Sequence, residues 1–183
     1  EQAVYQMEAF CKDHQINCEL RVDGTYYTAS NPAQVGSMDN IVQSLQDKQL
    51  SSWQKQPLEH VQRNTGSFAH LEGFYSPAAG SVQPSKLARG LKHVAEAMGI
   101  RIFENTPMLS LEEKLPATIT TPKGAVTADK VVIATNAWMP QQFKEFSRTV
   151  TLVSSDMLIT QPIPGLLKTV GLESGCAVVD SRT

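Results

Sequence analysis

Cys11, His14 and Cys18 are the residues whose types and spacing come nearest to metal-binding chemistry. Cys11 and His14 are three residues apart, so they share one face of a predicted helix. A structural zinc site needs four converging ligands, usually in two closely spaced pairs, and the sequence offers no second pair. Packed or exposed thiols are the favoured interpretation, and we predict no metal site.

The other histidines do not indicate nucleophilic catalysis. His60, His70 and His93 have no nucleophile at a recognisable triad spacing, although a triad can also assemble in space from distant residues. We therefore interpret them as ordinary surface or partly buried histidines, and no catalytic residue is assigned.

The glycines do not form a phosphate-binding loop. No two of the 11 glycines are two residues apart, which excludes the G-x-G-x-x-G turn, and the sequence has no G-x-x-x-x-G-K-[ST] motif. A doubly wound nucleotide-binding domain anchors its pyrophosphate on such a turn at a helix N-terminus. That anchor is missing from these 183 residues.

Composition indicates an ordinary globular chain that can bury a core. The hydrophobic fraction is 41% and the charged fraction 19%, which excludes a disordered tail or a fibrous repeat. The net charge of −2 lacks the basic excess of a nucleic-acid or anionic-membrane binder, and no apolar run is long enough to span a bilayer. Three sparse cysteines favour reduced thiols and a cytoplasmic location.

Apolar spacing predicts alternating helices and strands in the first 80 residues. The predicted helices are 3–14, 31–47 and 57–63, and the predicted strands are 18–22, 25–29 and 68–75. Asp23-Gly24 is a tight-turn sequence, so the first two strands are expected to form a hairpin. Asn31 before Pro32 is expected to cap the second helix.

The pattern from residue 80 to 140 is typical of an α/β unit. Leu87 to Met98 form the clearest helix, with Pro84 at its start and Gly99 at its end. The further predictions are strands at 100–104 and 130–135, a hairpin joining 119–121 to Val126, an extended region at 149–160, a loop at 162–165 and a strand-like run at 178–183. Together these elements predict a mixed α+β fold.

Several blocks of sequence, in order, resemble one family. They are GFYSPAAGSVQPSKLARGL at 73–91, GIRIFENTPM at 99–108, TPKG at 121–124 and ADKVVIATNAW at 128–138. This arrangement resembles the middle of the FAD-dependent amino-acid and amine oxidases of the D-amino-acid oxidase superfamily. It is most similar to the branch with glycine and sarcosine oxidases and γ-glutamylputrescine oxidase, and the similarity covers nearly the whole chain.

The resemblance implies an internal fragment of a two-part enzyme. Residues 1–80 would hold a helix and the first part of the substrate domain, with its mixed or antiparallel sheet. Residues 81–140 would be the middle of the FAD-binding α/β domain, and 141–183 would begin a second substrate-domain segment. Both chain ends are expected to be cut, and the surfaces so exposed are expected to favour self-association.

The resemblance also implies cofactor contacts at six residues: Met108, Ala134, Thr135, Asn136, Ala137 and Trp138. Met108 stands where the family usually has valine, at a strand end whose main chain reads the adenine edge. Asn136 stands where the family usually has glycine, and asparagine tolerates a positive φ better than most residues. Without the resemblance, a buried central strand followed by an irregular turn would be the favoured interpretation.

The activity implied by the resemblance is oxidation of a C–N bond in a small amine or amino acid. Hydride passes to flavin N5, the imine hydrolyses, and oxygen or another acceptor reoxidises the flavin. The fragment itself is expected to be inactive and to bind FAD weakly or not at all. Two alternatives remain open: a stand-alone non-catalytic binding or assembly module, and a flavin dehydrogenase that uses a quinone or a partner protein.

Overall fold

The computed structural model describes residues 1–50 and 52–180, which divide into two compact units. Unit 1 contains residues 1–101 together with the described residues from 160 onward, and unit 2 contains Ile102–Ile159. All buried residues among the described ones belong to unit 1, including Val61, Phe74 and Tyr26. The mixed α+β class predicted from the sequence is confirmed.

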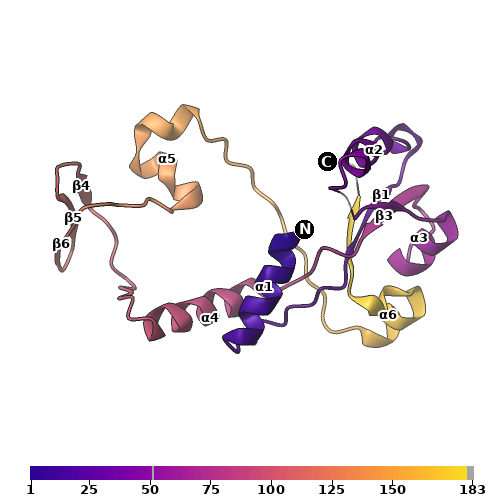
Figure 1. Ribbon diagram of the computed structural model, residues 1–183, viewed down its shortest axis with the longest axis horizontal. Coiled ribbons are helices and arrows are strands. Elements are labelled where there is room, and N and C mark those ends of the chain that lie inside the picture. Colours follow the sequence, from indigo (N-terminus) through magenta and orange to yellow (C-terminus); the bar gives the residue numbers. More distant parts are fainter. Residues whose placement is uncertain (51, 181–183) are drawn as a thin grey trace. The chain divides into compact units, whose positions relative to one another are not determined.

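Unit 1 is built around a four-stranded sheet in the order β2-β3-β1-β7 (Figure 1). Its strands are β1 (Thr25–Ala29), β2 (Gln54–Lys55), β3 (Glu72–Ser76) and β7 (Ala177–Asp180). β1 pairs with β3 antiparallel and with β7 parallel, so the last described strand lies beside the first. β7 confirms the predicted strand at 178–180, and Ser181, Arg182 and Thr183 lie outside the described residues.

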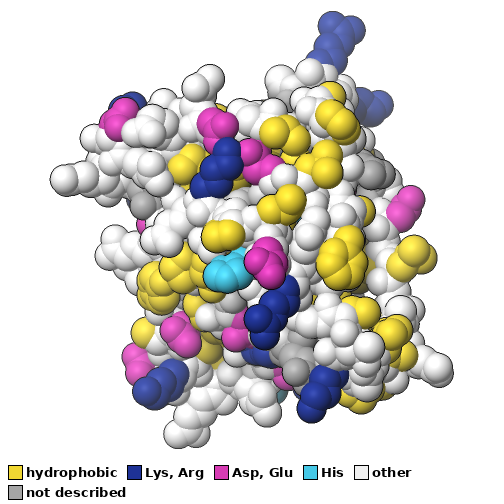
Figure 2. Space-filling view, turned by 90° about the vertical axis from the view of Figure 1, so that its right-hand side faces the viewer, with side chains coloured by type: hydrophobic (Ala, Val, Ile, Leu, Met, Phe, Trp, Pro, Cys, Tyr) yellow, Lys and Arg dark blue, Asp and Glu magenta, His cyan; other side chains and the backbone are white. Residues whose placement is uncertain are grey.

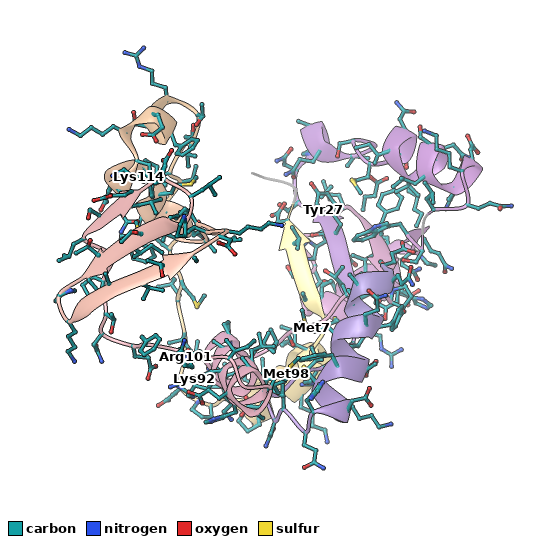
Figure 3. The ribbon with its side chains drawn as sticks, turned by 60° about the vertical axis from the view of Figure 1, so that its left-hand side comes forward. Met7, Tyr27, Lys92, Met98, Arg101 and Lys114 are labelled. Carbon is teal, nitrogen blue, oxygen red and sulfur yellow. The ribbon has the colours of Figure 1, made fainter. Side chains whose placement is uncertain are left out.

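The predicted hairpin of 18–22 with 25–29 is wrong. β1 takes β3 and β7 as its partners, while 18–22 contributes only one isolated bridge, between Arg21 and Ser81. Pairing with β3 places Tyr27 opposite Phe74 (Tyr27 is labelled in Figure 3) and helps to bury both faces of β1. The tight-turn sequence therefore does not determine the partners of β1, which pairs instead with strands distant in sequence.

Helices cover both faces of this sheet. Val61 of α3 (Leu58–Thr65) is fully buried against one face, where a Cβ added to Gly73 would lie 2.8 Å from Val61 Cγ1. On the opposite face, Gln34 and Met38 border Tyr27 and Phe74. The sheet thus forms the middle layer of unit 1.

The predicted helix 31–47 is two helices. Asn31 caps the first as expected, because its side chain accepts a hydrogen bond from the Ala33 N–H at 2.9 Å. That helix is the short η1 (Pro32–Gln34), and α2 (Asp39–Asp47) follows. Gly36 separates them with a φ of +82°, a left-handed conformation that breaks a helix and favours glycine.

The remaining helices of unit 1 follow the sequence closely. The predicted helix at 3–14 is α1 (Gln2–Asp13), and 57–63 corresponds to α3. α4 (Pro84–Ala97) starts at proline and ends before Gly99, whose φ is +85°. The predicted loop at 162–165 is only partly correct, because α6 (Pro164–Val170) begins within it, and η4 (Leu172–Ser174) follows α6.

Unit 2 contains an antiparallel sheet of three strands in chain order. They are β4 (Ser110–Glu112), β5 (Ala117–Thr121) and β6 (Gly124–Ala128). The predicted hairpin is confirmed, since Ile119 pairs with Val126. Three short helices follow: η2 (Asn136–Trp138), α5 (Met139–Gln142) and η3 (Lys144–Arg148).

Three segments predicted as strands or extended runs form no strand in the structure. They are 100–104, 130–135 and 149–160, and the predicted strand 68–75 is reduced to β3. A strand requires a neighbour for its main-chain groups, and no described segment pairs with these three. Val132 is consequently 88% exposed, although its run predicted a strand covered on both faces.

The described residues form neither a membrane-spanning helix nor a metal-binding cluster. Within residues 1–50 and 52–180, no helix combines the length and apolarity needed to cross a membrane. The same residues bring no three His, Cys, Asp or Glu side chains together as a metal site would require.

Candidate cofactor-binding site

All six predicted cofactor contacts lie in unit 2, on two separate segments. Met108 precedes β4, and 134–138 follow β6. β4 begins opposite Thr120 and β6 ends opposite Ala117, so the two segments leave the sheet from opposite ends. Among the hydrogen bonds of the described residues, none joins Met108 to 134–138, so these segments form two candidate contact points rather than one cluster.

Asn136 makes the sharp turn that the sequence predicted. Its φ is +48°, in the left-handed region where asparagine is the favoured residue after glycine. The Trp138 N–H closes the turn by donating to the Thr135 carbonyl oxygen at 3.1 Å. Asn136 therefore adopts a conformation that is otherwise typical of glycine.

Thr135 presents a buried hydroxyl to this turn. Its Oγ1 is inaccessible to solvent and has no hydrogen-bond partner among the described residues. A buried hydroxyl without a partner costs about 1–3 kcal/mol, so such atoms are rare in native structures. A polar ligand atom beside Thr135 would remove that cost, which fits the cofactor contact implied by the sequence.

The main-chain N–H and C=O groups of Met108 make no hydrogen bond with a described residue. Pairing begins one residue later, where the Leu109 N–H donates to the Thr120 carbonyl oxygen at 2.8 Å. The Met108 side chain is half-buried. Its main-chain N–H and C=O thus suit recognition of a flat polar edge such as a purine, because they carry one donor and one acceptor.

The small side chains around the turn leave its backbone accessible. Ala134 and Ala137 flank Thr135 and Asn136, and the main chain of 131–134 makes no hydrogen bond with another described residue. Trp138 is 65% exposed, so it does not contribute to a core within the described chain. This stretch can approach a ligand closely.

Unit 2 also contains a cavity of about 380 Å³ that the sequence reading missed. Leu111, Val131, Ile133 and Phe146 supply apolar wall, and Lys114 lies at its edge (Figure 3). Its volume suits a small ligand or a buried side chain. The alternation of Val131 and Ile133 was the only signal for it in the sequence, and none of the six predicted contacts lines it.

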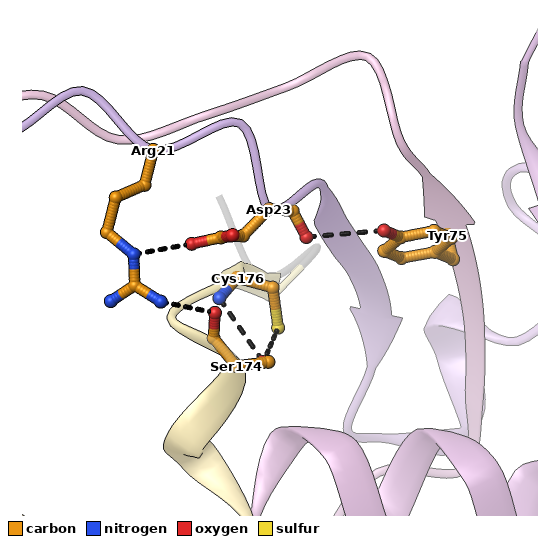
Figure 4. A network of polar contacts seen from close by, with 5 residues as sticks. All are labelled: Arg21, Asp23, Tyr75, Ser174 and Cys176. Carbon is orange, nitrogen blue, oxygen red and sulfur yellow. Dashed lines mark hydrogen bonds and ion pairs between the residues drawn. The ribbon is translucent and has the colours of Figure 1, made fainter.

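Unit 1 contains a polar network around Arg21 and Asp23 (Figure 4). The Arg21 guanidinium pairs with Asp23 at 2.7 Å and donates to the Ser174 carbonyl oxygen at 2.7 Å. Tyr75 donates to the Asp23 carbonyl oxygen at 3.2 Å. The Arg21–Ser174 bond joins residues 153 positions apart and links the chain just before β1 to the chain just before β7.

The comparisons with known proteins identify the family. The sequence model of the FAD dependent oxidoreductases called DAO matches residues 1–182. The chain therefore belongs to this FAD-dependent family, as its motifs predicted.

Individual relatives agree with this assignment. γ-Glutamylputrescine oxidoreductase of Escherichia coli is 24% identical over 128 residues, which are 70% of this chain and 30% of the relative. The structure of glycine oxidase from Geobacillus kaustophilus has a TM-score of 0.69 at 20% identity and covers 81% of this chain. L-Proline dehydrogenase from P. horikoshii has a TM-score of 0.73 at 16% identity and covers 99% of this chain.

The chain is short beside these relatives. The matched stretch is 31% of OrdL, a probable oxidoreductase of Haemophilus influenzae, and 30% of the γ-glutamylputrescine oxidoreductase. The chain covers 41% of the glycine oxidase and 48% of the proline dehydrogenase. The structural likeness shows the shared fold.

Proposed function

We propose that this chain is part of an oxidoreductase that uses FAD to oxidise a C–N bond of a small amine or amino acid. The observation that carries the proposal is the family match, which runs through both structural units. Relatives named for γ-glutamylputrescine and for glycine both point to substrates with a C–N bond. The division into substrate-domain segments at 1–80 and 141–183 around a flavin-domain segment at 81–140 is part of the proposal.

FAD, when bound, would supply the chemistry by accepting the hydride from the substrate carbon. The residues of this chain would hold and orient it. The Thr135 hydroxyl would hydrogen-bond a polar cofactor atom, and the Met108 main chain would bind the adenine edge. Asn136 would keep the turn, while Ala134, Ala137 and Trp138 complete the contact surface.

The 183 residues alone are proposed to bind FAD weakly or not at all and to be inactive. Thr135 and Met108 offer a few hydrogen bonds, but the glycine turn that anchors a pyrophosphate is not in the sequence. Titration of the purified chain with FAD, followed by flavin fluorescence, should show no saturable binding at micromolar concentrations. A purified chain that is yellow with bound flavin would contradict this.

The activity is tested with protein produced from the whole reading frame that encodes these residues. Mixed without oxygen with glycine, sarcosine or γ-glutamylputrescine, it should lose its visible flavin absorbance, whereas glycolate, which has a C–O bond instead, should leave it unchanged. Bleaching by glycolate alone would overturn the C–N assignment. A protein without flavin would favour the non-catalytic module, and reduced flavin that oxygen does not reoxidise would favour the dehydrogenase.

A further inference from the structure

Cys11 and Cys18 form a buried pair of thiols outside the candidate cofactor site. The Cys18 S–H donates to Cys11 Sγ across 3.8 Å. The side chains are only 6% and 1% exposed. The sequence favoured packed or exposed thiols here, and the structure buries both and brings the two sulfur atoms into contact.

Local backbone geometry brings the two cysteines together. At the end of α1 the Ile16 N–H donates to the Cys11 carbonyl oxygen at 2.7 Å, and the Gln15 N–H donates to that of Lys12 at 3.1 Å. Gln15 has a φ of +54°. This is a Schellman motif, which reverses the chain after a helix, so Cys18 returns over the last turn that carries Cys11.

A cavity gives small molecules access to the pair. It has a volume of about 460 Å³, and both cysteines line it. Glu8, Lys12 and Glu19 are the charged residues on its wall. A reagent of a few atoms fits this space, whereas the low exposure of both thiols excludes a bulky one.

The pair suits two-electron oxidation better than metal binding. Among the described residues, no third His, Cys, Asp or Glu joins these thiols to make a ligand set, and zinc requires four ligands. The two sulfur atoms are 3.8 Å apart, so they must approach by about 1.8 Å to reach the length of a disulfide bond, which is about 2.0 Å.

We propose that Cys11 and Cys18 are a modification site at which a hydroperoxide forms an intramolecular disulfide. One thiolate attacks a peroxide oxygen of H₂O₂ and becomes a sulfenic acid, and the other O–H group leaves with a proton as water. The second thiol then attacks the sulfenic sulfur, the S–S bond forms, and the sulfenic hydroxyl leaves as a second water. Two thiols are oxidised and one peroxide is reduced, so two thiols and H₂O₂ give one disulfide and two waters.

Burial slows this reaction at neutral pH. Desolvation, together with the neighbouring Cys18, raises the pKa of the Cys11 thiol, so little Cys11 thiolate is present near pH 7. The site therefore rests as a dithiol and should oxidise faster in mildly alkaline buffer. Glu8 and Glu19 on the cavity wall oppose thiolate formation, and Lys12 favours it.

The experiment uses the 183-residue chain with Cys176→Ser, which removes the third cysteine and keeps the proposed pair intact. The folded protein is treated with H₂O₂, and its thiols and intact mass are measured. The expected result is loss of both thiols and a monomer lighter by two hydrogen atoms, restored by a dithiol reductant. Added oxygen atoms on one cysteine, a disulfide-linked dimer or two surviving thiols would overturn the proposal.

Two matched controls test whether the fold directs the reaction. Cys11→Ser and Cys18→Ser in the same background should each abolish the internal disulfide while circular dichroism stays unchanged. The Cys176→Ser chain unfolded in urea should divide its oxidised cysteine among the internal disulfide, linked dimers and over-oxidised thiols, whereas the folded chain should give the internal disulfide as its main product. An equal share of internal disulfide in the folded and unfolded chain would show that sequence proximity alone brings the cysteines together, and would overturn the structural claim.

Discussion

The buried Oγ1 of Thr135 favours a bound cofactor, because this atom has no hydrogen-bond partner among the described residues. Its neighbour Asn136 adopts the positive φ that its residue type predicted. A residue's own backbone preference is a local property, so the sequence could predict it. The burial of the Thr135 hydroxyl depends on residues elsewhere in unit 2, and no sequence pattern indicated it.

His70 should make the stability of unit 1 depend on pH. It is 8% exposed, its Nδ1 has no described partner, and burial lowers its pKa despite the opposing effect of Asp180. The unfolded chain therefore takes up a proton more readily than the folded one. Neutral His70 therefore contributes its full stability when the pH is above 6.5, the ordinary pKa of histidine. This contribution is lost as the pH falls through the lower pKa of the folded state.

His70→Phe tests this expectation, because phenylalanine fills the site without titrating. Between pH 7 and pH 5 the variant should lose less unfolding free energy than the parent chain in urea titrations. His93→Gln is the matched control, since the His93 side chain is 78% exposed and its loss should leave the pH profile nearly unchanged. Parallel profiles for the parent and His70→Phe would contradict the account.

At the scale of elements, the contact between α3 and β3 depends on the absence of a side chain at Gly73. A Cβ there would lie 2.8 and 2.9 Å from the two methyl carbons of Val61, which is fully buried. Gly73→Ala should therefore lower the unfolding free energy by about 1–3 kcal/mol, the usual cost of overpacking a core.

Gly165→Ala provides the matched comparison. This residue lies in α6, and nothing lies within 4 Å of an added Cβ. Alanine is the better helix former by up to about 1 kcal/mol, so this variant should be neutral or slightly stabilising. Equal destabilisation of both variants in urea unfolding would refute the proposed packing.

Elements with local signals were predictable and long-range pairings were not. The Asn31 cap, the α4 boundaries and the β5–β6 hairpin each depend on residues close in sequence. The parallel pairing of β1 with β7 joins residues about 150 apart, and no periodicity encodes such a partner. For the same reason, the apolar pattern at 130–135 predicted a strand but could not supply the neighbour that a strand needs.

At the scale of the whole molecule, the described chain leaves much apolar surface in contact with solvent. No described residue of unit 2 is fully buried, and Val153, Met157, Leu158 and Ile159 are each at least 85% exposed. By contrast, the face in Figure 2 shows apolar side chains interspersed with charged ones. An exposed apolar stretch of this kind favours association.

We therefore expect the 183-residue chain to self-associate as its concentration rises. Light scattering coupled to gel filtration should show a concentration-dependent increase in mass, and Leu158→Lys should reduce it severalfold. Thr151→Lys, which adds the same charge to the same exposed segment, should reduce it much less. A monomer at every concentration would contradict this prediction.

We expect the turn at Thr135–Asn136 to hold FAD, and this can be tested by measuring the FAD dissociation constant of protein produced from the whole reading frame. Thr135→Ser keeps the hydroxyl and Thr135→Val replaces it with a methyl group of similar size. The account predicts that serine leaves the constant nearly unchanged and that valine raises it about fivefold, which corresponds to one lost hydrogen bond of about 1 kcal/mol. Equal FAD affinity in the valine variant and the parent protein would contradict it.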